Sequence, residues 1–86
     1  MSTKKFPPLT PSEVIKILEQ WGFKRGEQKG SHVKYEGFVD GKRQVVTVDI
    51  KERDFGVPLM KSIICQSGMS REEFYNTNKK LSQKIK

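Results

Sequence analysis

Cysteine, histidine and long apolar runs are scarce in this 86-residue sequence, and their scarcity excludes several classes of protein. A single cysteine, Cys65, cannot form an internal disulfide or a cysteine-based zinc site. No apolar run approaches the ~20 residues that a membrane-spanning helix needs, and the N-terminus has no apolar signal region. We therefore expect a cytoplasmic protein, with Cys65 buried in the core because it lies in an apolar helical stretch.

Acidic residues are also in the minority. The chain has 17 lysines and arginines against 10 aspartates and glutamates, which gives a formal charge of +7. Such an excess favours an anionic partner, most often nucleic acid, although a solubilising surface is the alternative. The length predicts one domain over residues 10–78, after a flexible arm at 1–9 and before a basic tail at 79–86.

Local patterns predict a two-layer α+β domain. Thr10 with Glu13, and Ser70 with Glu73, can each form a capping box, and apolar residues one helical turn apart follow the first. The Asp40-Gly41 pair is typical of a tight hairpin turn, and β-branched residues dominate the returning strand. The expected elements are a helix over 11–21, strands over 23–28, 32–39 and 43–50, a helix from Pro58 to Gly68, and a helical segment after Ser70.

Strand alternation divides the predicted sheet into two faces. Ser31, Val33 and Tyr35 fall on one face, which suits a core covered by helices. His32 and Lys34 then fall on the opposite, open face, where an antiparallel sheet can remain in contact with water. The residues expected to point inward from the later elements are Val46, Val48, Ile50, Leu59, Ile63 and Ile64.

His32 is the only histidine and the first candidate for chemistry, because imidazole can take and give a proton near neutral pH. On a basic surface it could support RNA cleavage, in which the substrate's own 2′-hydroxyl is the nucleophile. His32 would act as the general base, and cationic side chains would stabilise charge on the phosphate. Lys34 is the first such phosphate-binding candidate, with Lys24 and Lys29 as further ones. This chemistry needs no metal and no cofactor.

Other readings of the residues remain open. Phosphate loops, dinucleotide fingerprints, nucleophile elbows and zinc ligand sets are absent from the sequence. Asp49, Glu52 and Asp54 could hold a magnesium ion, or could simply be solvated. The domain could bind RNA without cleaving it, or could serve only as a protein-interaction domain.

The sequence resembles the HicA toxin family from about Thr10 to Tyr75. The likeness rests on Trp21-Gly22-Phe23, on Gly30-Ser31-His32 followed by Tyr35, on Val46-Thr47-Val48, and on the stretch from Ile63 to Phe74. The resemblance implies a double-stranded-RNA-binding-domain-like α-β-β-β-α fold, with helices on one face of a three-stranded antiparallel sheet. It also implies a ribosome-independent mRNA interferase of a type II toxin–antitoxin system, with His32 as the catalytic residue and a HicB-type antitoxin as partner. Ser31 is included with Lys24, Lys29 and Lys34 in the expected RNA-binding set, and it is expected to help position the loop before His32.

The chain departs from the family pattern at two positions. Val33 stands where many relatives have a second histidine, and Asp49 stands where many have proline. By alternation Val33 lies on the face opposite His32. Asp49 adds an anion to the open face, where it could orient His32 if the strands pair in that register.

Overall fold

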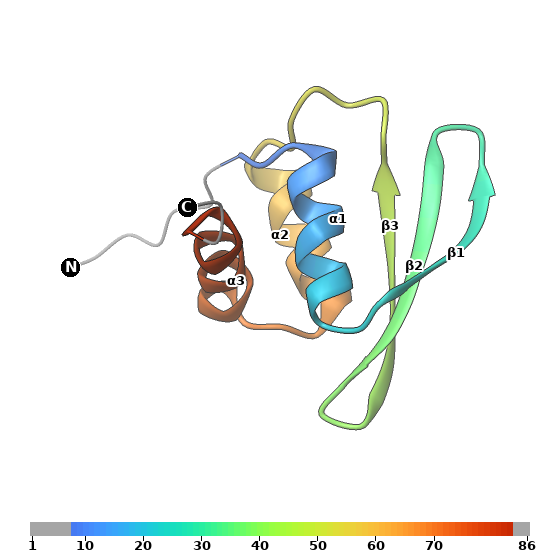
Figure 1. Cartoon of the computed structure of the whole chain (residues 1–86). Coiled ribbons are helices and arrows are strands. Elements are labelled where there is room, and N and C mark those ends of the chain that lie inside the picture. Colours follow the sequence, from blue (N-terminus) through green and yellow to red (C-terminus); the bar gives the residue numbers. More distant parts are fainter. Residues whose placement is uncertain (1–7, 84–86) are drawn as a thin grey trace.

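Two helices cover one face of a three-stranded antiparallel sheet, and a third helix packs against the first of them on the side away from the sheet (Figure 1). The computed structural model describes residues 8–83, so most of the predicted arm and the last three residues of the predicted basic tail lie outside the described part. The sheet order β1-β2-β3 confirms the predicted α+β architecture. The elements are α1 Pro11–Gln20, β1 Lys24–Lys29, β2 His32–Val39, β3 Lys42–Asp49, α2 Val57–Ser67 and α3 Arg71–Gln83.

Side-chain caps begin two of the helices, as the sequence predicts. The Thr10 hydroxyl accepts from the Glu13 backbone N–H at 3.2 Å, and the Glu13 carboxylate accepts from the Thr10 N–H at 2.9 Å. Ser70 and Glu73 form the same reciprocal pair before α3, at 3.0 and 2.8 Å. Each cap satisfies backbone donors that have no partner within the helix.

The long β2–β3 hairpin forms one end of the molecule, where it extends past the helices (Figure 1). Its turn confirms the prediction, because Asp40 and Gly41 both have positive φ, 54° and 77°. Along β2 exposed and buried residues alternate without exception. Gly37 is one of the buried positions: a Cβ there would lie 2.7 Å from the Phe23 ring, so the ring occupies the space of the missing side chain.

The core lies between the sheet and the helices. It contains Val33, Tyr35, Val46 and Val48 from the strands, packed against apolar residues of α1, α2 and α3. The indole N–H of Trp21 donates to the Thr77 hydroxyl at 2.7 Å, which ties the end of α1 to α3. Within residues 8–83, no helix combines the length and apolar character that crossing a membrane requires.

The chain segment before α1 also belongs to the folded body. Leu9 is buried, and its carbonyl accepts from the Phe55 N–H at 2.9 Å. Leu9 therefore packs with the domain although the sequence assigned it to the arm. At the other end α3 continues into the predicted tail as far as Gln83.

Three predicted core positions are wrong. Cys65 is exposed, because the buried face of α2 is formed by Met60, Ile63, Ile64 and Ser67, and position 65 lies off that face. Leu59 is exposed for the same reason. Ile50 is exposed because β3 ends at Asp49, and the chain turns away from the sheet at that point.

Candidate nucleic-acid-processing site

His32 is the first residue of β2, immediately after the turn that joins β1 to β2. Its neighbours across the sheet are Lys29 on β1 and Asp49 on β3. The His32 side chain is 61% exposed, so alternation correctly predicted that it faces outward. Pairing with two neighbouring strands holds the backbone of His32 in place, while its imidazole is accessible. A substrate can therefore reach the imidazole without rearrangement of the backbone.

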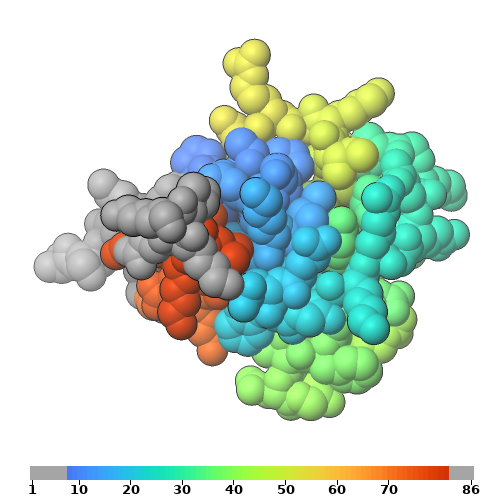
Figure 2. All heavy atoms as spheres, viewed as in Figure 1, coloured from blue at the N-terminus to red at the C-terminus, as the bar shows by residue number. Residues whose placement is uncertain are grey.

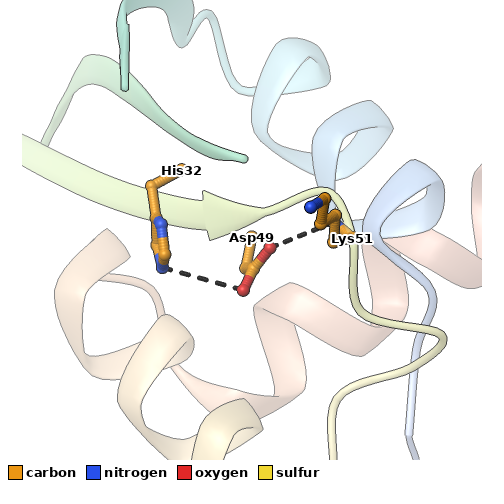
Figure 3. A network of polar contacts seen from close by, with 3 residues as sticks. All are labelled: His32, Asp49 and Lys51. Atoms are coloured by element: carbon orange, nitrogen blue, oxygen red, sulfur yellow. Dashed lines mark hydrogen bonds and ion pairs between the residues drawn. The ribbon is translucent and has the colours of Figure 1, made fainter. Parts of the chain in front are cut away.

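Asp49 is held beside His32 by its own hydrogen bonds (Figure 3). One carboxylate oxygen accepts from the Lys51 backbone N–H at 3.0 Å, and the other lies 3.7 Å from Nε2 of His32. The Lys51 N–H, then a hydrogen bond from the Ser31 side chain, and then the nearby His32 and Lys51 charges lower the pKa of Asp49 below its ordinary value of 3.8. Asp49 is therefore a fixed anion near neutral pH.

The distance of 3.7 Å between Nε2 of His32 and the Asp49 carboxylate is too long for a hydrogen bond. A small approach of the two side chains would give the imidazole a carboxylate partner on one ring nitrogen. Such a partner fixes the ring's orientation and its tautomer, leaving the other nitrogen for proton transfer. The sequence left open whether the strands pair in the register that brings His32 and Asp49 together, and the structure has that register.

Two of the predicted phosphate-binding residues gather around His32. Lys29 and Lys34 line a shallow hollow of about 390 Å³ together with His32, Glu27 and Thr47. Both lysines are exposed, and Thr47 is the cross-strand partner of Lys34. Two ammonium groups beside an imidazole form a surface suited to a phosphate group, which accepts hydrogen bonds from both.

A second hollow, of about 310 Å³, lies on the other side of His32, between β3 and α2. Phe55, Leu59 and Ile63 supply an apolar wall, and Gln66 on α2 lies at the rim. The Gln66 side-chain oxygen accepts from the Thr47 N–H at 3.1 Å, so α2 is anchored to the outer edge of β3. Sequence reasoning missed this wall, because no local pattern joins α2 to residues about 20 positions earlier in the chain.

The remaining predicted site residues lie elsewhere. Lys24 lies toward the opposite end of the sheet, across from Glu36, and lines a different hollow. Ser31 was predicted to point away from the open face. Instead it belongs to the turn before β2, and its side chain bonds to Asp49, the carboxylate beside His32. Strand alternation does not extend to this turn residue.

The acidic residues considered for magnesium do not form a site. Within residues 8–83, no three His, Cys, Asp or Glu side chains come together in a group that could hold a metal ion. Asp49 is instead engaged with Ser31, His32 and Lys51.

A comparison with protein-family models identifies the chain. Residues 11–69, more than half of the sequence, match the model described as the HicA toxin of bacterial toxin–antitoxin systems. The chain belongs to the HicA toxin family. The match spans α1, the complete sheet, α2 and the residues that follow it, so it includes every side chain that surrounds His32. No curated protein matches the sequence.

Proposed function

We propose that this HicA-family chain is a ribosome-independent mRNA interferase that cleaves RNA with His32 as its general acid/base. The observation that carries the proposal is the arrangement of His32 itself. Its exposed imidazole lies between two lysines on one side and an ionised carboxylate on the other. That arrangement provides a proton acceptor, phosphate-binding cations and an orienting anion on one accessible face.

In the proposed reaction the RNA supplies its own nucleophile. His32 removes the proton from the 2′-hydroxyl next to the scissile phosphate, and the 2′-oxygen attacks phosphorus. The bond from phosphorus to the 5′-oxygen breaks, and the leaving oxygen takes a proton from the imidazolium. The products end in a 2′,3′-cyclic phosphate and a 5′-hydroxyl, so neither an activated water nor a metal ion is required for the cleavage step.

The neighbouring side chains have distinct roles in this proposal. Lys29 and Lys34 contact the phosphate and stabilise the charge that develops on it in the transition state. Asp49 is a positioning residue that acts through His32, and Ser31 positions Asp49. The protein partner would be a HicB-type antitoxin that covers the active surface.

The proposal is tested by comparing His32→Ala with Gln20→Ala, which changes an exposed residue of α1 and serves as the control. We expect His32→Ala to reduce RNA cleavage by about 10²–10⁴-fold, the usual contribution of a positioned general base. Its free energy of unfolding should remain within about 0.5 kcal/mol of the wild type, because the side chain is exposed. Gln20→Ala should retain both activity and stability.

Two results would contradict the proposal. Undiminished cleavage by His32→Ala would remove the imidazole from the mechanism. RNA binding without any cleavage by the wild-type protein would leave a non-catalytic RNA-binding domain.

A further inference from the structure

Phe38 is the most exposed large hydrophobic side chain among residues 8–83, at 68%. It lies on the same face of β2 as His32, six residues further along the strand. At ~3.3 Å per residue the two side chains are separated by roughly 20 Å. Phe38 belongs to the β2–β3 hairpin, whose end extends past the helices (Figure 1).

Cationic side chains share a hollow with the Phe38 ring. Phe38 lines a hollow of about 430 Å³ together with Lys24, Arg25 and Arg43. Arg43 on β3 is the cross-strand partner of Phe38 on β2. Glu36 is the one carboxylate in this hollow, and Arg43 pairs with it at 3.0 Å. Positive charge therefore predominates around an apolar ring that is open to solvent.

The combination of an accessible aromatic ring with flanking cations is the arrangement by which proteins hold single-stranded nucleic acids. The bases stack on the aromatic side chain, and the cations follow the phosphate backbone. Unpaired RNA is recognised in this way because its bases can be splayed out, whereas the bases of a duplex cannot. A protein partner would also accept an exposed ring, but it would not require cations on several sides of it.

We propose that Phe38 is a stacking site for an unpaired base of the RNA whose scissile phosphate lies at His32, with Lys24, Arg25 and Arg43 contacting the adjoining phosphates. The inference rests on the proposed nuclease function and names the form of its substrate: RNA that is single-stranded for some distance beyond the cut. At the ~3.4 Å rise of a stacked strand, a separation of roughly 20 Å corresponds to no more than about six nucleotides.

In Figure 2 the β2–β3 hairpin (green) and β1 (teal) lie next to each other on the side of the molecule away from α3. The open face of β2 joins the two ends of the proposed RNA path, since its exposed side chains are, in order, His32, Lys34, Glu36 and Phe38. Glu36 interrupts this path with a negative charge, which its pair with Arg43 offsets. The path therefore remains compatible with a polyanion.

Substrate length distinguishes stacking at Phe38 from a general effect on the enzyme. One RNA has about two nucleotides on each side of the cut, and the other has about eight unpaired nucleotides on each side, enough to span the separation estimated from the strand rise. For Phe38→Ala we expect kcat/KM to fall about 5- to 150-fold on the long RNA, as for the loss of one stacked base, and to stay unchanged on the short RNA. Phe38→Trp should retain activity on both, and Phe38→Leu should behave like Phe38→Ala.

Val57→Ala is the matched control, because it truncates an exposed apolar residue at the start of α2. This variant should cleave both RNAs as the wild type does.

A second measurement separates this inference from the nuclease proposal. In the His32→Ala background, adding Phe38→Ala should weaken binding of the long RNA by the same factor even if cleavage is not the protein's activity. Equal losses on short and long RNA, full activity of Phe38→Leu, or no loss at all would overturn the stacking site. Unchanged RNA kinetics with weakened antitoxin binding would also overturn it, and would assign Phe38 to the protein interface.

Discussion

The eight residues of β2 alternate between two faces of the sheet, and the two faces differ in what they contribute to the protein. Val33, Tyr35, Gly37 and Val39 are buried against the helices, whereas His32, Lys34, Glu36 and Phe38 are exposed. The inner face contributes apolar burial, at roughly 25 cal/mol per Å² of apolar surface. The outer face contributes little to stability and carries the imidazole, the cations and the aromatic ring. Substitutions on the two faces should therefore separate stability from activity.

The largest effect on stability is expected from adding one methyl group to the inner face. In Gly37→Ala the new Cβ would lie 2.7 Å from the Phe23 ring, which is itself buried and cannot move freely. We expect a loss of about 1–3 kcal/mol in the free energy of unfolding, as for other overpacked cores. Chemical denaturation measures this loss.

The adjacent position on the outer face provides the comparison. Glu36→Ala removes only an exposed ion pair with Arg43, so it should change stability by no more than about 1 kcal/mol. If Gly37→Ala had the same free energy of unfolding as the wild type, the inner face would be no more sensitive to substitution than the outer face, which would contradict the comparison.

A medium effect is expected on RNA binding from Lys34. Lys34→Gln removes one cation from the hollow beside His32. For single-stranded RNA the slope of log K against log salt concentration should become shallower by about 0.7, the value for one lost phosphate contact. Lys16→Gln, an equal change of charge on the exposed side of α1, is the control. Identical slopes for the two variants would show that Lys34 does not contact phosphate.

The smallest effect concerns acid stability at Asp49. The pKa of this carboxyl is lower in the folded protein than its ordinary value of 3.8, first because the Lys51 N–H binds the ionised form. The ionised form therefore stabilises the fold above pH 3.8, and this contribution is lost as the pH falls through the lower pKa of the folded state. Asp49→Asn lacks it at every pH.

Urea unfolding at several pH values between about 6 and 2.5 measures the difference between wild type and Asp49→Asn across the range of carboxylate titration. The difference should be constant above the ordinary pKa and should shrink as the pH falls below it. A difference that grows in acid would contradict the assigned direction.

Local sequence signals predicted the sheet and the helix starts well. The alternation in β2, the Asp40-Gly41 turn and the two capping boxes each depend on residues close together in the chain. They gave the correct topology and the outward direction of His32. The cross-strand pair of His32 and Asp49 was left conditional on the register, although the Asp40-Gly41 turn fixes which residues of the hairpin face each other.

Signals that depend on distant contacts were read less well. The apolar stretch of α2 contains more hydrophobic positions than its buried face can hold, so Leu59 and Cys65 could not be distinguished from Met60 and Ser67 without knowing how the helix is rotated against β3. The hydrogen bond from the Thr47 N–H to the Gln66 side chain contributes to that orientation, and no local sequence pattern predicts this hydrogen bond. Phe38 was not singled out, although the alternation that places His32 on the open face places Phe38 there too.

The central claim is that a ribose hydroxyl breaks the RNA strand while His32 handles its proton. The most direct test replaces one nucleotide, at the mapped cut, by its 2′-deoxy form and measures cleavage and binding of that RNA by the wild-type protein. We predict that cleavage at this position disappears and that the affinity for the RNA is unchanged. Cleavage of the deoxy-substituted RNA at the original rate would contradict the account.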